Sequence, residues 1–276
     1  MTYDLQGQAL LAWDQLLTYP ETALLAFDFD GTLSPITDDP ESAYAHPEVG
    51  AVLGRVGHRV AQVAVVTGRP VRTVVELGGF EGTAGLDNLV VLGQYGVERW
   101  DATTGQHVEP PPPDGIAAVR EELPVLLAGL ELAGAHIEEK GRALGVHVRR
   151  LPDPQGAYDR LVGPLKHLAE RHQLVVEPGR QIIEIRAQGM DKGAALRSLV
   201  DEVGARCVVF GGDDLGDIPA FDVVAELRDD GTGTTGLRIC SVSGEQGQMA
   251  GHADLVVDGP DGLVAFLDDL ASRLGV

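Results

Sequence analysis

The chain has 276 residues, of which 44% are hydrophobic and 23% charged, so it has the composition of a globular protein with a large core. Its formal net charge of −21 argues against nucleic acid or an anionic membrane surface as a partner. We see no apolar run that could span a bilayer, no secretory signal pattern, and only two cysteines. We therefore expect a cytoplasmic protein with reduced thiols.

The first strong signal along the chain is the unbroken apolar run 23–27, which ends in Asp28 and Asp30. Such a run is typical of a strand buried on both faces of a parallel sheet. Because side chains alternate along a strand, both carboxylates should leave its carboxyl end on one side, where open α/β sheets bind ligands. Further buried strands are expected over residues 60–66, 89–92, 206–210, 237–241 and 253–257. Helices are expected over about residues 5–17, 46–56, 191–203 and 262–274.

The composition changes at residues 110–113, a run of four prolines that suits a hinge or spacer. The pattern beyond it is helix, hairpin, helix, hairpin, which indicates a small α+β insert with one exposed sheet face. Its helices are expected over residues 116–132 and 157–172, with a break or kink at Pro124 and Pro164, and its hairpins over 135–149 and 174–186. We assign residues 1–108 and 187–276 to a core domain and residues 109–186 to the insert.

Polar residues end several of the predicted core strands: Asp28 and Asp30, then Thr67, then Asp213. Lys192 begins the helix that leads into the last of these strands. This set has the parts for phosphoryl transfer through an aspartyl-phosphate, namely an attacking carboxylate, ligands for a divalent metal, phosphate-binding groups and a general acid. Taken singly, each residue is better explained as a turn, a helix cap or a solvated lysine. Their joint occurrence favours a catalytic site.

These residues resemble the four motifs of the haloacid dehalogenase superfamily, which here read Asp28-Phe29-Asp30-Gly31-Thr32, Thr67, Lys192 and Gly212-Asp213-Asp214-x-x-Asp217. The resemblance implies a Rossmann-like α/β core, with a mainly parallel sheet flanked by helices, and an inserted α+β cap of the C2 type. It implies Asp28 as nucleophile, Asp30 as general acid/base, and Thr67 and Lys192 as further catalytic residues. The implied Mg²⁺ ligands are Asp28, the backbone carbonyl of Asp30, Asp213 and Asp214.

The segment 28–36 together with Asp38-Asp39-Pro40 resembles the trehalose-6-phosphate phosphatase family, and so does the layout from about residue 24 to 270. In that family a Glu-x-Lys pair, a His-x-Arg strand and a later Glu of the cap face the sugar. The matching residues here are Glu138, Lys140, His147, Arg149 and Glu184, and the resemblance also implies substrate contacts from Gly68 and Arg69. Alternatively, these cap residues form only a solvated sheet surface without a role in binding.

The resemblance implies a Mg²⁺-dependent phosphatase acting on trehalose 6-phosphate, with a possible functional link to a trehalose-phosphate synthase. Two crossings join the core and the insert, near residues 107–113 and 186–189, and they predict hinge closure over the sugar. The core motifs leave open a phosphatase for another sugar phosphate, such as sucrose 6-phosphate or a glycosyl phosphoglycerate. A non-catalytic sugar-phosphate sensor is the alternative from another class, although no nucleophile or metal ligand is missing. Gly216 and Ile218 stand where the family usually has Thr and Glu, and Tyr95 stands where it often has His.

Overall fold

The computed structural model covers the whole chain and describes every residue except 1–2, 38, 180, 188–190 and 243–248. The chain divides into two compact units, which we call the core unit and the cap unit. The core unit comprises Met1–Glu109 and Asp191–Val276, and the cap unit comprises Pro110–Met190. Among the described residues, no helix is both long enough and apolar enough to cross a membrane.

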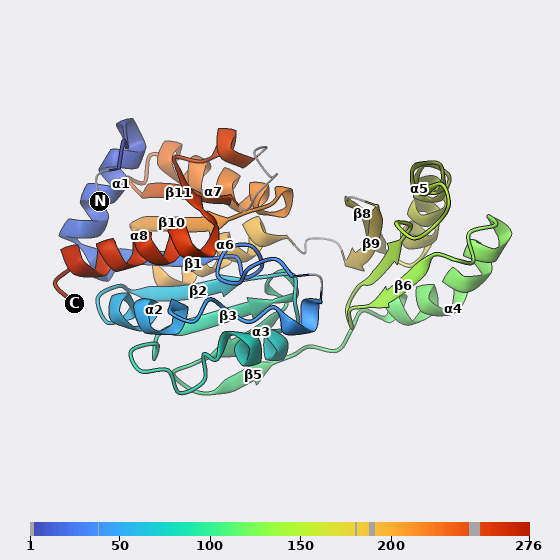
Figure 1. Cartoon of the computed structure of the whole chain (residues 1–276), viewed down its shortest axis with the longest axis horizontal. Coiled ribbons are helices and arrows are strands. Elements are labelled where there is room, and N and C mark those ends of the chain that lie inside the picture. The colour runs from blue at the N-terminus through green and yellow to red at the C-terminus, as the bar shows by residue number, and fades with distance from the viewer. Residues whose placement is uncertain (1–2, 38, 180, 188–190, 243–248) are drawn as a thin grey trace. The chain divides into compact units, whose positions relative to one another are not determined.

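The core unit is built on one sheet. Its strands are β1 (Ala23–Phe27), β2 (Gln62–Val66), β3 (Leu89–Gly93), β4 (Glu98–Asp101), β5 (Gln106–Val108), β10 (Cys207–Gly212), β11 (Thr235–Val242) and β12 (Leu255–Asp258). Their order across the sheet is β12-β11-β10-β1-β2-β3-β4-β5 (Figure 1). Neighbours from β12 to β3 are parallel, and β4 and β5 add an antiparallel edge.

Helices cover both faces of this sheet, which is why its central strands are apolar throughout. They are α1 (Gly7–Thr18), α2 (Val49–Gly57), α3 (Val71–Gly78), α6 (Lys192–Val203), α7 (Ile218–Asp229) and α8 (Gly259–Arg273). Leu25 and Phe27 of β1 pack with residues of α1, α2, α3 and α8. Leu24 and Ala26 point to the other face and pack with α6 and α7. β1 is therefore buried on both sides, as an unbroken apolar run requires.

The strand order places β1 at a topological switch point. From β1 the chain proceeds to β2 and β3 on one side, and after the cap unit it returns through β10, β11 and β12 on the other side. The carboxyl ends of β1, β2 and β10 are therefore neighbours, and the loops that follow them diverge. Ligands bind at such points in open α/β sheets.

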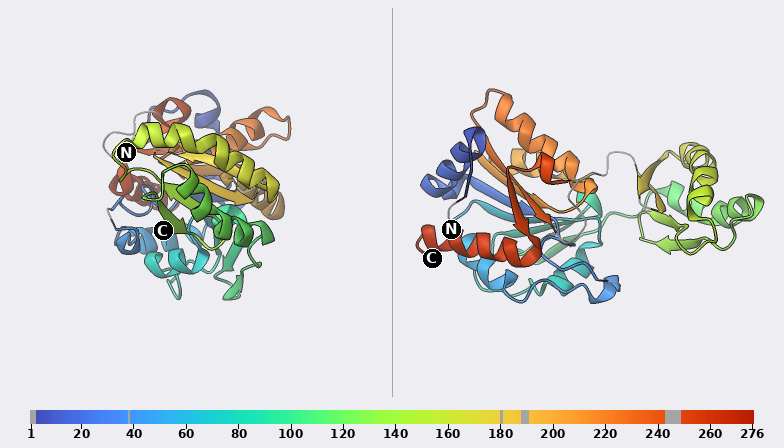
Figure 2. Two further views of the ribbon diagram at one scale, coloured as in Figure 1. Left: turned by 90° about the vertical axis from the view of Figure 1, so that its right-hand side faces the viewer. Right: turned by 45° about the horizontal axis from the view of Figure 1, so that its top comes forward.

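The cap unit is a two-layer α+β structure. It contains α4 (Asp114–Gly129), β6 (His136–Glu139), β7 (Leu144–His147), α5 (Pro154–Arg171), β8 (Leu174–Gly179) and β9 (Ile182–Ala187). The strands form an antiparallel sheet in the order β6-β7-β9-β8. Both helices cover one face of it, where they pack on apolar residues of β7 and β9 (Figure 2). The predicted α/β fold class is thus confirmed: a mainly parallel sheet flanked by helices, and an inserted antiparallel unit.

Some elements were not predicted. The edge strands β4 and β5 have little apolar alternation, since Trp100 is the one buried residue of β4 and none of β5 is buried. The helices α3 and α7 begin just after the polar strand ends, in stretches for which the sequence predicted no element. The helices α4 and α5 continue through Pro124 and Pro164, so neither helix is broken at its proline.

Candidate active site

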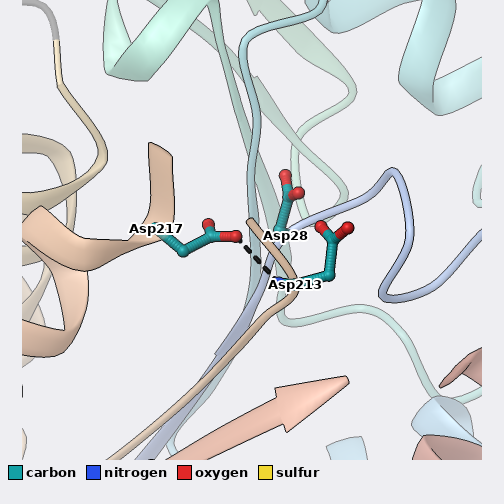
Figure 3. Close-up of side chains that lie close together, drawn as sticks. All are labelled: Asp28, Asp213 and Asp217. Atoms are coloured by element: carbon teal, nitrogen blue, oxygen red, sulfur yellow. Dashed lines mark hydrogen bonds between the residues drawn. The ribbon is translucent and has the colours of Figure 1, made fainter. Parts of the chain in front are cut away.

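Three acidic side chains gather at the carboxyl end of the core sheet (Figure 3). Asp28 directly follows β1, and Asp213 follows β10, the strand beside it. Asp217 ends the short 3₁₀ turn η4 (Leu215–Asp217). One carboxylate oxygen of each lies within 4.8 Å of the others, and the three residues are 4%, 3% and 0% exposed respectively. Close, buried carboxylates need positive charge or protons between them.

Lys192 supplies one positive charge. It is the first residue of α6, and the N-cap Asp191 fixes that helix start by accepting a hydrogen bond from the backbone N–H of Ala194 at 2.8 Å. Its Nζ lies 2.8 Å from Oδ1 of Asp28 and 2.8 Å from Oδ1 of Asp217. Since Lys192 is only 5% exposed, its ammonium is held by these carboxylates instead of water.

Asp217 organises the turn that carries Asp213. Its Oδ2 accepts hydrogen bonds from the backbone N–H groups of Asp213 at 2.9 Å and Asp214 at 3.2 Å, while Oδ1 accepts from Lys192. A Cβ on Gly212 would lie 2.4 Å from Cγ of Asp217, so only glycine fits beside it. With both oxygens of Asp217 engaged, Asp28 and Asp213 are the carboxylates better placed for an ion, and their side chains point the same way in Figure 3.

The electrostatics show an excess of negative charge. Burial raises the pKa of Asp28 to about 8; Lys192 opposes this rise, and Asp217 and Asp214 add to it. Burial also raises the pKa of Asp213 to about 9, helped by repulsion from Asp28. Burial lowers the pKa of Lys192, but attraction by Asp217 and Asp28 raises it well above its ordinary value overall. One ammonium therefore does not balance the acidic group.

A hard divalent cation fits this site. Carboxylate oxygens are the ligands that Mg²⁺ prefers, and a cation beside Asp28 and Asp213 would offset both the burial and the weaker repulsion that raise their pKa values. These two residues line a cavity of about 250 Å³. The other lining residues are Asp30, Ile36, Thr37, Pro40, Ala43, Arg69 and Asp214. The buried acidic group of Asp28, Asp213 and Asp217 could therefore hold a metal ion.

Gly31 allows the turn that follows the two acidic residues. Its φ is +72°, a left-handed conformation that favours glycine, and a Cβ there would lie 2.1 Å from Oδ2 of Asp213. The Asp213 carboxylate thus packs directly on this backbone. The hydroxyl of buried Ser241 on β11 donates to the carbonyl of Gly31 at 2.7 Å and holds the turn from the other side.

The predicted residues at the end of β2 contact one another and Asp30. Thr67 is buried, and its Oγ1 accepts from the backbone N–H of Arg69 at 3.1 Å. The Arg69 guanidinium, expected at the substrate, donates to both carboxylate oxygens of Asp30. A Cβ on Gly68 would lie 2.8 Å from the ring of Tyr95, so this glycine lets the ring approach.

Among the other residues expected at the metal, Asp214 is exposed, and its Oδ1 accepts from the backbone N–H of Gly216 at 2.8 Å, although it lines the cavity. Asp39 caps the 3₁₀ turn η2 (Pro40–Ser42) through the backbone N–H of Glu41, whereas Asp38 lies outside the described residues. The turn at Gly216 forms with glycine in place of the family's Thr.

The strained backbone at Gln94 and Tyr95, beside Thr67, was not predicted from the sequence. Gln94 and Tyr95 follow β3 with φ values of +48° and +58°. Their backbone N–H groups donate to the carbonyls of Arg69 and Thr67, each at 2.9 Å. The sequence feature that indicates this segment is a pair of polar residues directly after a buried strand, flanked by Gly93 and Gly96.

Charged side chains of the cap unit form a chain of contacts on its sheet. Nζ of Lys140 lies 2.8 Å from Oε2 of Glu184 and 3.7 Å from Oε2 of Glu138, which also contacts Nε2 of His147 at 2.8 Å. Gly145 pairs in register with both Glu138 and Glu184, so no side chain stands between these two acids. The apolar residues of β7 and β9 point to the opposite face, toward the helices.

Arg149, the fifth residue expected here, lies in the turn after β7 and is exposed. Oε1 of Glu184 is buried and has no hydrogen-bond partner within the described residues. An unsatisfied buried acceptor costs free energy, and a ligand hydroxyl would satisfy it.

The chain is similar to known proteins in both sequence and structure. The model of the trehalose-phosphatase family matches residues 26–261. A trehalose-phosphate phosphatase of Mycobacterium tuberculosis is 32% identical over 265 residues, which are 90% of this chain and 61% of that protein. An uncharacterized glycosyl hydrolase of the same species is 30% identical over 272 residues, 94% of this chain and 19% of that protein. The structure of Aspergillus fumigatus trehalose-6-phosphate phosphatase has the same fold, with a TM-score of 0.72 and 22% identity over 98% of this chain and 99% of that one.

The chain spans 61% of the length of that trehalose-phosphate phosphatase and 19% of the length of that glycosyl hydrolase. The family match nevertheless extends from the last part of β1 into α8 and so includes both units. This chain therefore belongs to the trehalose-phosphatase family.

Proposed function

We propose that the protein is a Mg²⁺-dependent phosphatase that hydrolyses trehalose 6-phosphate to trehalose and phosphate through an intermediate on Asp28. The observation that carries this proposal is the buried group of Asp28, Lys192 and Asp213 at the switch point of the sheet. It combines a carboxylate that can attack phosphorus, an ammonium for a phosphate oxygen and a second carboxylate for a metal ion. Membership of the trehalose-phosphatase family supports the reaction class.

In the first step, an oxygen of Asp28 forms a bond to phosphorus while the bond from phosphorus to the sugar oxygen breaks. Lys192 contacts Oδ1 of Asp28, so we assign the attack to Oδ2. Asp30 gives its proton to the departing sugar oxygen. Asp30 then takes a proton from water as the water oxygen bonds to phosphorus, and the bond from phosphorus to Asp28 breaks. Thr67 and Lys192 bind the remaining phosphate oxygens.

A Mg²⁺ ion held by Asp28, Asp213 and the backbone carbonyl of Asp30, with Asp214 nearby, would offset the negative charge of the phosphate and of the nucleophile. This set leaves Asp217 in its structural role, because both of its oxygens are already engaged.

We assign the sugar to the polar sheet face of the cap unit. Glu138, Lys140, His147 and Glu184 present linked acceptors and donors there, and Arg149 adds a nearby cation. The unpartnered Oε1 of Glu184 suits a hydroxyl donor, which favours a sugar over a solvated surface. The same contacts would serve another sugar phosphate, so sucrose 6-phosphate and a glycosyl phosphoglycerate are the alternative substrates.

We place this activity in the cytoplasm, because both cysteines are buried free thiols, and we propose a functional link to a trehalose-phosphate synthase that makes the substrate. A small sugar phosphate is the proposed partner. The net charge of −21 makes nucleic acid and anionic membranes poor partners.

A phosphate-release assay across trehalose 6-phosphate, sucrose 6-phosphate and a glycosyl phosphoglycerate, with Mg²⁺ and with a chelator, tests the proposal. We expect the highest kcat/KM with trehalose 6-phosphate, and no turnover with the chelator. Asp28→Asn should abolish turnover, whereas the matched exposed control Asp222→Asn on α7 should not. Calorimetric binding of trehalose 6-phosphate without phosphate release would identify a sensor instead.

A further inference from the structure

Arg69 holds the Asp30 carboxylate with a two-point contact. Its Nε lies 2.6 Å from Oδ2 of Asp30, and its Nη2 lies 2.7 Å from Oδ1. The third nitrogen, Nη1, donates to the carbonyl of Pro40 at 2.7 Å. Such a fork fixes the direction of a carboxylate more firmly than a single hydrogen bond does.

The backbone of Arg69 is itself fixed. Its N–H donates to Oγ1 of Thr67 at 3.1 Å, and its carbonyl accepts from the N–H of Gln94 at 2.9 Å. The backbone of Arg69 is therefore bonded to residues at the ends of β2 and β3. In the sheet β2 lies next to β1, and β3 lies next to β2. The Arg69 side chain is 18% exposed and that of Asp30 is 40% exposed. A rigid arginine thus restrains an acid that would otherwise be free to rotate into solvent.

We propose that Arg69 is a positioning residue, which aims the Asp30 carboxyl group at the leaving oxygen and is not itself a substrate ligand. This inference rests on the proposed function, in which Asp30 is the general acid. Each carboxylate oxygen has two acceptor sites, and the fork uses one on each oxygen. One site on each oxygen of Asp30 is therefore left for the transferred proton. The bond to Pro40 also anchors the loop that forms one wall of the cavity.

The proton transfer gives this role a specific signature. When the bond from phosphorus to the sugar oxygen breaks, that oxygen leaves as an unstable alkoxide unless Asp30 supplies a proton. The nitrophenolate released from p-nitrophenyl phosphate is stable without one. In this first step, a residue that acts through Asp30 should therefore matter for the sugar phosphate and much less for p-nitrophenyl phosphate. The step is compared through kcat/KM, because the later attack of water on phosphorylated Asp28 also uses Asp30, is common to both substrates and affects kcat. A residue that binds the phosphate group should matter equally for both.

The experiment compares the wild type with Arg69→Gln and Arg69→Lys on the two substrates, with Mg²⁺ present. For trehalose 6-phosphate we expect Arg69→Gln to lower kcat by about 10- to 100-fold, because the acid is misplaced, with KM changed by less than about threefold. For p-nitrophenyl phosphate the loss in kcat/KM, which reports the step that forms the intermediate, should stay below about threefold. The loss in Arg69→Lys should lie between those of the wild type and Arg69→Gln, since lysine keeps the charge but cannot form the two-point contact.

Two further comparisons sharpen the result. Arg99→Gln is the control, because Arg99 also makes a two-point contact with a carboxylate. Its Nη1 and Nη2 donate to Glu202 at 2.7 and 2.8 Å, and neither residue lines the cavity, so the variant should be neutral on both substrates. When Arg69→Gln is added to Asp30→Asn, kcat should fall by no more than about threefold relative to Asp30→Asn alone. The reason is that the carboxylate positioned by Arg69 is already absent. Thermal unfolding of each variant confirms folding, and if Arg69→Gln does not fold, Arg69→Lys carries the comparison.

A raised KM with unchanged kcat would overturn the inference and make Arg69 a direct substrate ligand. Equal losses of kcat/KM on both substrates would overturn it as well. If the wild type released phosphate from neither substrate, the proposed function would fail, and this inference with it. An active wild type whose Arg69 variants lack the selective loss would refute the positioning role alone.

Discussion

Nζ of Lys192 lies 2.8 Å from Oδ1 of Asp28, the carboxylate to which we assign the attack on phosphorus. The contact joins the start of α6 to the end of β1, two segments that lie on either side of the cap unit in the sequence. Because both side chains are almost completely buried, the ammonium restricts Asp28 to one orientation and partly compensates its charge.

Removing this ammonium should impair both chemistry and folding. We expect Lys192→Met to lower kcat by about 10²- to 10³-fold, because one preorganised contact to the phosphate is lost. It also leaves two buried carboxylates without their cation, which costs on the order of 3–5 kcal/mol where a single partner of a buried pair is removed. Steady-state kinetics and thermal unfolding measure the two effects. Lys166→Met, at an exposed position of α5, is the control. Equal changes of kcat and of the unfolding temperature in the two variants would refute the role assigned to Lys192.

Without a metal ion, the stability of the core unit should fall as the pH rises from about 4 to about 9. Burial raises the folded-state pKa of Asp28 to about 8 and that of Asp213 to about 9. In the unfolded chain both groups ionise near pH 4, roughly the ordinary value for Asp. Between these limits the folded state binds more protons than the unfolded state, so raising the pH favours unfolding. Denaturant titrations in a chelator at several pH values check this slope.

Mg²⁺ should act in the opposite direction, because it replaces those protons. We expect it to raise the unfolding temperature more at pH 8 than at pH 5. Asp213→Asn should lose this response and, in chelator at pH 8, should be more stable than the wild type by about 1 kcal/mol or more. Asp222→Asn should behave as the wild type. A wild type whose stability without metal rises with pH across this range would contradict the assigned electrostatics.

Gly31 should be needed for the metal response as well as for the turn. In Gly31→Ala, the added Cβ would lie 2.1 Å from Oδ2 of Asp213 at a left-handed φ of +72°. We expect lower stability and loss of stabilisation by Mg²⁺, because Asp213 must move away. Gly79→Ala is the matched control: its φ is +59°, but no atom lies within 4 Å of the added carbon. It should cost about 1 kcal/mol of stability and keep the Mg²⁺ response. Equal Mg²⁺ responses in the two variants would show that Asp213 does not depend on this contact.

The sequence predicts the centre of the fold better than its edges, for a physical reason. A strand buried on both faces is a continuous apolar run, so β1 and β10 stand out, and the polar residues that follow them mark the site. β4 and β5 are half-exposed edge strands whose residues do not alternate clearly. The helix α7 begins at Ile218, directly after the acidic turn, and the polar residues of that turn obscure its start in the sequence.

Within the site, the sequence shows which side chains follow the strands but not which partner each takes. Asp214 and Asp217 belong to one motif, yet the 3₁₀ turn leaves Asp214 exposed and buries Asp217 completely against Lys192. Arg69 was expected at the substrate and contacts Asp30, because β1 and β2 are neighbours in the sheet. These outcomes depend on turn geometry and strand order, which residue type alone does not specify.

An ion cluster away from the cavity should control stability in acid. Asp254 accepts hydrogen bonds from Arg228 of α7 and Arg238 of β11. Burial raises the pKa of Asp254, but these two arginines outweigh that effect and lower it to about 2. Since the unfolded value is about 4, the stabilisation is complete above about pH 4 and is lost as the pH falls toward about 2.

Asp254→Asn should therefore lower the free energy of unfolding at pH 7 by about 1–2 kcal/mol and should weaken its dependence on pH below about 4. Urea titrations at pH 7 and at pH 3 measure both quantities. Asp268→Asn removes a carboxylate that is 61% exposed and paired with Arg55, so it should change little. A loss as large in Asp268→Asn as in Asp254→Asn would show that burial and the double arginine contact are not the cause.

The cap unit should govern affinity for the sugar and leave the phosphate chemistry alone. Glu184 is 8% exposed, its Oε2 accepts from Lys140 at 2.8 Å, and its Oε1 has no partner within the described residues. We expect Glu184→Gln to raise KM for trehalose 6-phosphate by roughly 10-fold or more, the cost of one charged hydrogen bond. Its kinetics with p-nitrophenyl phosphate, which has no sugar, should match those of the wild type.

Glu139→Gln is the control for that comparison, because Glu139 lies one residue from Glu138 on β6, points to the opposite face, and pairs with exposed Arg120. It should leave both substrates unaffected. If Glu184→Gln changed neither KM, the sugar would have to bind elsewhere, and if it slowed both substrates equally, the residue would act on folding or on the phosphate. A selective rise in KM is the outcome expected only when the open sheet face and the sugar are in contact.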